Sequence, residues 1–127
     1  MISTIELYNE RNKVLGYIDG SSVLDKKMKP IGKIDANAIR DKDGVALLNI
    51  SADGKLSYDF DGPGSPGYVK EGKIFDKGDG LRYAYRPKTG EIIDEMGATR
   101  VVVRGDTSKI GDRELIGIAS IFFNLFA

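Results

Sequence analysis

The chain has 127 residues, of which 41% are hydrophobic, enough for the core of one ordinary domain. Its 19 Lys and Arg residues equal its 19 Asp and Glu residues, so no net charge draws it to an anionic membrane and we expect no nucleic-acid partner. It contains neither Cys nor His, which excludes disulfides, thiolate metal sites and catalysis by a Ser-His-Asp or Cys-His arrangement.

The first elements in the chain belong to a repeat. Residues 1–13 lack a basic region followed by an apolar run, so we expect no signal peptide and a cytoplasmic protein. From there on, a polar residue recurs at intervals of 16 to 18 residues, after a short apolar or β-prone stretch and before a small or polar turn. We call these recurring residues the anchors; they are Asn9, Asp25, Asp41, Asp59, Asp76, Asp94 and Asp112.

Each unit of about 17 residues has room for two short strands and two turns, and not for a helix of ordinary length. Pairs such as Asp19-Gly20 and Asp53-Gly54 are typical of two-residue hairpin turns, in which both central residues need positive φ. A lone hairpin cannot bury its apolar face, and closing an array of hairpins into a ring removes the unpaired edges. The sequence therefore predicts a single all-β domain over residues 1–127, a closed antiparallel meander or barrel of about seven two-strand repeats covering residues 5–112.

The anchors have a structural interpretation. An Asp at a strand end accepts hydrogen bonds from backbone amides further along, which fixes a turn. The runs that begin at Asp41 and Asp59 resemble the start of a calcium loop, but their twelfth positions hold Ala52 and Lys70 in place of Glu, so we expect no metal site. In the second strands, Gly16, Gly32 and Gly67 predict a bend or a close backbone approach.

The last segment, residues 113–127, is apolar on every side between 116 and 126 and is too short to span a bilayer. A ring of about 14 strands leaves a lumen roughly 9 Å in radius, too wide to stay empty, and a helix about 10–12 Å across can enter it. We therefore predict that this segment plugs the lumen, with a final strand as the alternative. The side chains expected inside are Ile118, Ile121, Phe122, Leu125 and Phe126.

Three stretches carry a family resemblance: LGYIDG at 15–20, IGKID at 31–35 and GYVKEG at 67–72. They resemble the units of bacterial β-flower proteins, which carry Asp-x-x-x-x-x-Ile-Gly-Tyr-Ile and an Asp-Gly turn, and the similarity extends from Ile5 to about Ile118. Near the place of the central glycine, the third, fifth and sixth units hold Leu48, Ala84 and Val102. The resemblance implies a shallow pseudo-symmetric β-barrel, distantly like tubby-type lipid-associated barrels, and implies no established activity.

Three classes of function fit these patterns: a non-catalytic module that meets lipid or a partner protein, a carrier of a small apolar ligand or a glycan-binding repeat protein, and an enzyme that works through carboxylates. With no His or Cys and with the aspartates assigned to turns, we predict the first class, with no catalytic residue and no cofactor. Tyrosines along the strands could stack on sugars, or simply pack there with wet hydroxyls; they are Tyr8, Tyr17, Tyr58, Tyr68, Tyr83 and Tyr85. Cations near the second strands could form a basic rim for lipid phosphates, or could be solvated strand ends; they are Lys13, Lys29, Lys33, Lys70, Arg100 and Arg104.

Overall fold

A computed structural model describes residues 4–58, 65–123 and 125, and it is mostly β. Within these residues, twelve strands form one antiparallel sheet in which neighbours in the chain are neighbours in space, and β1 also pairs with β12. The prediction of an all-β antiparallel meander is therefore confirmed. The strands are β1 (Thr4–Tyr8), β2 (Val14–Asp19), β3 (Ser22–Asp25), β4 (Pro30–Ile34), β5 (Ala38–Asp41), β6 (Ala46–Ile50), β7 (Leu56–Ser57), β8 (Gly67–Lys70), β9 (Lys73–Asp76), β10 (Leu81–Arg86), β11 (Glu91–Asp94) and β12 (Thr99–Gly105).

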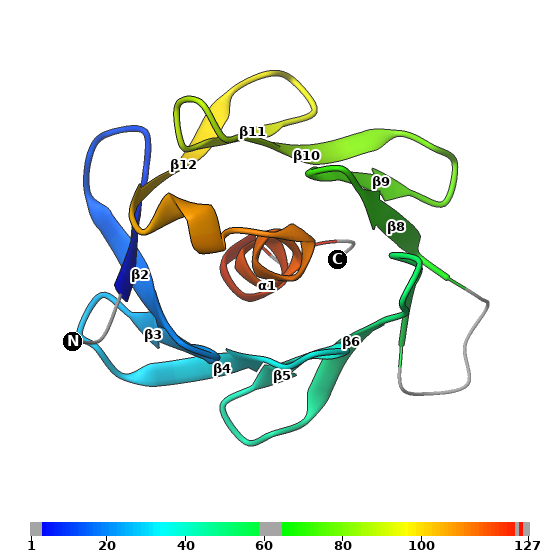
Figure 1. The fold of residues 1–127 in the computed structure, drawn as a ribbon, viewed down its shortest axis with the longest axis horizontal. Coiled ribbons are helices and arrows are strands. Elements are labelled where there is room, and N and C mark those ends of the chain that lie inside the picture. Colours follow the sequence, from blue (N-terminus) through cyan, green and yellow to red (C-terminus); the bar gives the residue numbers. More distant parts are fainter. Residues whose placement is uncertain (1–3, 59–64, 124, 126–127) are drawn as a thin grey trace.

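The sheet curls into a ring that is nearly closed (Figure 1). Its two ends are the short strand β7 and strand β8, which meet through one isolated bridge between Lys55 and Tyr68. Burial alternates along many strands: Ile5 and Leu7 of β1 are buried while their neighbours are half-exposed. Because successive side chains of a strand point to opposite faces, this alternation gives the ring an apolar interior and a polar outer wall.

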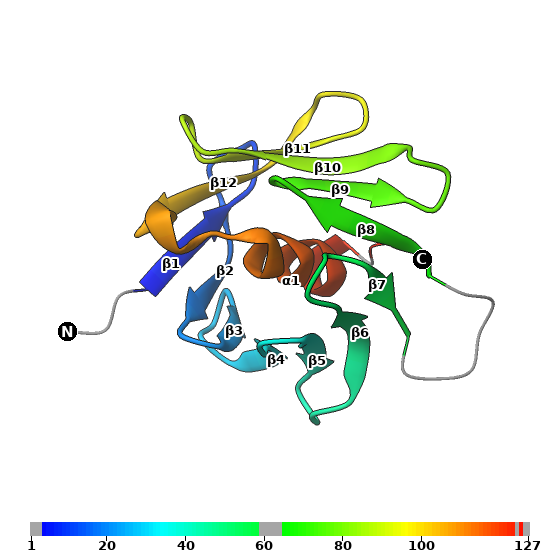
Figure 2. The same ribbon diagram turned by 45° about the vertical axis from the view of Figure 1, so that its right-hand side comes forward.

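After β12 the chain forms a short 3₁₀ helix (Thr107–Lys109) and then helix α1 (Asp112–Phe123). Figure 1 shows α1 almost end-on inside the ring, and Figure 2 shows it between β8–β10 on one side and β3–β6 on the other. Its side chains at Leu115, Ile116 and Ile118 are each 0% exposed. A helix surrounded by apolar walls needs no polar face, which explains why the segment is apolar all round.

Glycines of the strands receive the side chains of α1. At Gly32, a methyl group would lie 2.5 Å from Cδ1 of Ile121 and 2.9 Å from the carbonyl oxygen of Arg40. At Gly16, it would collide with the carbonyl oxygen of Leu24 and lie 2.8 Å from Cζ of Phe122. The close approach expected at these two glycines is therefore made by helix side chains as well as by neighbouring strands.

On β10, large side chains stand where β2 and β4 have Gly16 and Gly32. Tyr83 stacks on Phe123 with ring centroids 5.8 Å apart, and Tyr85 also packs against the core. The helix contacts β4, β5, β6 and β8, and the two tyrosines fill space beside β10. Small residues thus line the wall near the helix and large ones line a more distant wall, so the hairpins differ from one another inside the ring.

Candidate functional site

Five of the seven anchors organise a turn in the same way. In each, one side-chain oxygen accepts hydrogen bonds from the backbone amides two and four residues further on, at 2.8 to 3.0 Å. The fourth residue of the turn donates its amide to the carbonyl of the anchor and has positive φ. The five anchors are Asn9, Asp25, Asp41, Asp76 and Asp94.

These turns are three-residue loops, whereas the two-residue turns that we expected were those of the Asp-Gly pairs. A type I turn followed by a residue in the left-handed region is the three-residue hairpin loop, and it places glycine, or a residue that tolerates positive φ, at the fourth position. Asp53-Gly54 belongs to a loop of this kind, in which Lys55 donates its amide to Ser51 Oγ at 3.0 Å. The pair Glu71-Gly72, with φ of 51° and 77°, is the two-residue type.

The structure does not show a turn of this kind at the other two anchors, Asp59 and Asp112. Asp59 lies outside the described residues. Asp112 does not form a hairpin turn: it begins α1, and its Oδ1 accepts the backbone amide of Gly72 at 2.9 Å. Asp112 therefore ties the start of the helix to the turn between β8 and β9, and the assignment of a seventh hairpin to it was wrong.

The residues predicted inside the lumen lie on α1 and just beyond it. Ile118 and Leu125 are buried, while Ile121 and Phe122 are partly buried and pack against the core. Phe126 lies outside the described residues. That these side chains together plug the lumen stays a prediction.

The antiparallel meander brings the five anchor turns to one end of the ring, because each of them joins an odd-numbered strand to the next even-numbered one. We call residues 9–13, 25–29, 41–45, 76–80 and 94–98 the turn rim. Figure 1 shows hairpins that splay outward around α1. The turn rim carries three of the four exposed large hydrophobic side chains of the described residues: Met28, Val45 and Met96, with exposures of 53%, 60% and 85%.

Charge on the turn rim is segregated. Turns 9–13, 25–29 and 41–45 are neighbours in the sheet and form its basic side, with six cations against four carboxylates. Turns 76–80 and 94–98 form its acidic side, with one cation, Lys77, against four carboxylates. Two arginines just beyond the acidic side, Arg82 and Arg100, form ion pairs with Glu95 and Asp94. The cations of the basic side are Arg11, Lys13, Lys26, Lys27, Lys29 and Lys42.

Two of the anchor carboxyl groups, Asp25 and Asp94, have a pKa below the ordinary value. The amides of Lys29 and Lys27 lower the pKa of Asp25. At Asp94, burial raises the pKa, but the amides of Ala98 and Met96 and the Arg100 guanidinium outweigh it, so the net shift is downward. Hydrogen bonds to the charged form of a carboxyl group favour that form.

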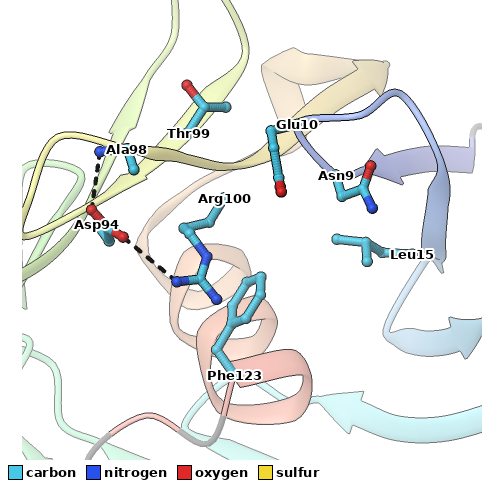
Figure 3. A pocket seen from close by; sticks show the side chains of 8 residues that line it. All are labelled: Asn9, Glu10, Leu15, Asp94, Ala98, Thr99, Arg100 and Phe123. Atoms are coloured by element: carbon cyan, nitrogen blue, oxygen red, sulfur yellow. Dashed lines mark hydrogen bonds and ion pairs between the residues drawn. The ribbon is translucent and has the colours of Figure 1, made fainter.

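A pocket of about 440 Å³ opens between the first and last turns of the rim and the end of α1 (Figure 3). The Arg100 guanidinium lies in it, 3.5 Å from Asp94 Oδ2 and 5.1 Å from the centre of the Phe123 ring. Leu15 and Phe123 supply apolar surface, and Glu10 supplies a carboxylate. The pocket can therefore hold a small group that has both polar and apolar parts.

The tyrosines singled out in the sequence do not make one stacking platform. Tyr8 donates its hydroxyl hydrogen to Glu6 at 2.6 Å and has the Arg104 guanidinium 4.4 Å over its ring. Tyr68 donates to Asp79 at 2.7 Å and stacks on Phe75. The others are spread between the core, where Tyr58, Tyr83 and Tyr85 pack, and strand β2, which carries Tyr17.

The cations singled out in the sequence also separate. Lys13 and Lys29 lie on the basic side of the turn rim, and Arg100 lies in the pocket. The other three are on strands: Lys33 on β4, Lys70 on β8 and Arg104 on β12. Sequence reasoning missed Met28, although aligning the anchors places it at the fourth position of its turn, where positive φ is required.

In the part of the chain that the structure describes, no three Asp or Glu side chains converge on a point where a metal ion could be held. No helix among the described residues is long and apolar enough to cross a membrane. Comparison with protein-family models, with curated proteins and with solved structures finds no match.

Proposed function

We propose that this protein is a non-catalytic interaction module whose binding surface is the turn rim. The observation that carries the proposal is the concentration of exposed apolar side chains there: Met28, Val45 and Met96 all project from anchor turns. Isolated exposed hydrophobic residues are common on protein surfaces, but the gathering of three of the four on one edge of the fold favours an interaction site there. Loops held by a rigid scaffold are also where binding residues concentrate.

Electrostatics supports a non-catalytic role. A general acid or base works best when its pKa lies near the pH at which it operates. The described carboxylates with shifted pKa values move the other way: the hydroxyl of Ser51 lowers the pKa of Asp53, and that of Thr99 lowers the pKa of Glu91. These groups serve as hydrogen-bond acceptors for their own turns and strands.

The carrier of an apolar ligand has less support. Leu115, Ile116 and Ile118 of α1 are fully buried inside the ring, where an apolar ligand would have to sit. The open pocket near Arg100 mixes charged and apolar groups, which suits a polar ligand better. The resemblance to β-flower proteins is part of this proposal, and it implies a shallow pseudo-symmetric β-barrel without an established activity.

The test is photo-cross-linking in the cells that make the protein. The photoreactive residue p-benzoylphenylalanine replaces Val45 or Met96 on the turn rim, and Lys88 in the exposed turn at the opposite rim serves as the matched control. We expect adducts, protein or lipid by mass spectrometry, from the rim positions and not from position 88. Equal labelling at both rims, or no adduct at the turn rim, would refute the proposal.

A further inference from the structure

Met28 is the most unusual residue of the turn rim. It sits at the fourth position of its turn with φ of 66° and is 53% exposed. The equivalent positions of the other anchor turns hold residues that adopt positive φ more readily: Asn12, Gly44, Asp79 and Gly97. A bulky side chain in this conformation costs free energy, and an exposed apolar one brings no packing in return. Met28 therefore combines an unfavourable backbone conformation with an exposed apolar side chain, and neither helps the fold. Such a residue points to a role in binding.

The surroundings of Met28 are cationic. Lys26, Lys27 and Lys29 lie on the same turn and are exposed. The flanking turns add Arg11 and Lys13 on one side and Lys42 on the other. Long Lys side chains keep their ammonium groups in water while their stems cover apolar surface. The basic side is thus an apolar tip ringed by cations.

The separation of cations from carboxylates makes the two sides of the turn rim electrostatically different. Since the whole chain has no net charge, the excess of cations on three turns is balanced elsewhere, in part by the acidic side of the same rim. An anionic surface attracts the basic side and repels the acidic side, so it orients the molecule as well as binding it. Each Lys or Arg near an anionic bilayer strengthens binding about fivefold.

The composition of the basic side favours a bilayer over a protein partner. The cores of protein interfaces are depleted in Lys and enriched in aromatic residues, whereas these three turns carry five lysines and no aromatic residue. Their tips belong to three separate hairpins, and three tips can touch one flat surface together. Met28 and Val45 supply apolar groups that can enter the headgroup region while lysines meet the phosphates.

We propose that the basic side of the turn rim docks on an anionic lipid bilayer, with Met28 entering the interface. This rests on the proposed function and names the partner of the same surface.

The experiment is flotation of the full chain with vesicles of phosphatidylcholine alone or of phosphatidylcholine mixed with phosphatidylglycerol. We expect binding only to the anionic vesicles, and binding that weakens as NaCl is added because salt screens the lysines. The double variant Lys26→Glu/Lys27→Glu should bind at least about tenfold more weakly. The control on the acidic side, Lys77→Glu, reverses one charge instead of two and should bind like the unmodified protein.

A second pair of variants isolates the apolar tip. Met28→Asn keeps a residue that tolerates positive φ, as Asn12 does in the neighbouring turn, so the fold should be preserved or stabilised while vesicle binding falls severalfold. Met96→Gln, on the acidic side, should leave binding unchanged although Met96 is the more exposed residue. Thermal melts of all four variants verify that each one is folded.

Each outcome decides the proposal. Equal binding to neutral vesicles, equal loss in Lys77→Glu, or displacement by inorganic phosphate at an ionic strength at which NaCl leaves the protein bound would overturn docking on a bilayer. If photo-cross-linking at the turn rim captures proteins while no vesicle is bound, the partner proposed here is wrong and the rim remains a binding surface. If neither occurs, both proposals fail.

Discussion

One oxygen atom organises each anchor turn. Asp41 Oδ1 accepts the amides of Asp43 and Val45, both at 2.9 Å, and Asn9 Oδ1 makes the same pair of bonds with Arg11 and Lys13. Since the amide oxygen of Asn9 suffices, the turn needs an acceptor at this place and not a negative charge.

Replacing Asp41 tests this account. Asp41→Ala leaves two turn amides without their side-chain acceptor, and we expect a loss of about 1–2 kcal/mol in the free energy of unfolding. Asp41→Asn keeps the acceptor and should cost much less. Asp43→Ala, in the same turn, removes an exposed side chain and is the control. Urea denaturation measures all three, and equal losses in the Ala and Asn variants would contradict the role of the oxygen.

The lowered pKa of Asp25 also predicts how stability depends on pH. The pKa of Asp25 in the folded protein lies below its ordinary value of 3.8, mainly because Lys29 donates its amide to the carboxylate. The folded state therefore favours the ionised form, so this contribution is present above the ordinary pKa and is lost as the pH falls through the lower folded value. We expect a melting temperature that is flat from neutral pH to about 5 and falls below about 4.

Scanning calorimetry across this range checks the expectation, with Asp25→Asn as the reference. Because Asn does not titrate, the variant should lose less stability on acidification than the unmodified chain. A melting temperature that already declines between pH 7 and 5 would show that other groups dominate.

At the scale of elements, the helix and the ring fit together through specific pairs. Gly32 of β4 receives Ile121, and Gly117 of α1 in turn receives Ile34 of β4, whose Cδ1 would lie 2.6 Å from an added methyl group. Small and large residues alternate across the contact, as they do in well-packed cores. The contact between β4 and α1 is therefore specific in position.

A double-mutant cycle measures this contact. Gly32→Ala overfills the space against Ile121 and should cost about 1–3 kcal/mol. Ile121→Val alone should cost about 0.5–1.5 kcal/mol, but it removes the Cδ1 atom that the new methyl meets, so the double variant should cost less than the sum. Gly78→Ala, whose added methyl meets only Asp76 Oδ1 at 3.5 Å, is the neutral control. Strict additivity would mean that the two residues do not interact.

The sequence predicted the hairpins better than it predicted what they enclose. The repeat of anchors is local, and each anchor bonds to residues within four positions, so its spacing indicates a hairpin directly. The last apolar segment shows no hydrophobic periodicity, because a helix surrounded by apolar strands is apolar on every side. The sequence therefore did not decide whether this segment forms a helix or a strand. Asp112 matched the spacing, but its partner Gly72 lies 40 positions away, where no local pattern could show it.

At the scale of the molecule, strand number and lumen size agree. A closed ring of twelve strands about 4.8 Å apart and tilted by about 40° has a radius of about 12 Å. Inward side chains of about 5 Å leave a space about 14 Å across, slightly more than the 10–12 Å of a helix with its side chains. The wider ring expected from about seven repeats would fit the helix less closely.

Truncation tests how far the ring depends on α1. Ending the chain after Leu115 removes Ile116 and Ile118, which are both fully buried. We expect the truncated protein not to fold in soluble form. The point variant Ile118→Ala should instead remain folded and lose about 2–5 kcal/mol. Expression, circular dichroism and thermal melts distinguish these outcomes, and a truncated chain that melts like the full one would show the helix to be dispensable.

The turn rim could be recognised as a candidate site only from the arrangement of the whole molecule. Lys13 and Lys29 could be singled out in the sequence, but they were grouped there with Lys33 and Lys70, which lie on strands. The order of the strands decides which turns are neighbours and thereby separates a basic side from an acidic one. The chain has equal numbers of positive and negative side chains, but they are unevenly distributed around the turn rim.

The position of α1 after all twelve strands also sets the order of events during synthesis. Hairpins such as β2–β3 join residues close in the chain, so they can form transiently as they leave the ribosome, in about 1–10 μs. The pairing of β1 with β12 must wait, because Ile5 pairs with Gly105, and helix α1 is made later still. Until then the nascent chain holds an apolar concave sheet with open edges, a state prone to aggregation and suited to chaperone binding. Because all twelve strands are synthesised before α1, we expect the apolar interior of the sheet to be covered only when the helix has been made.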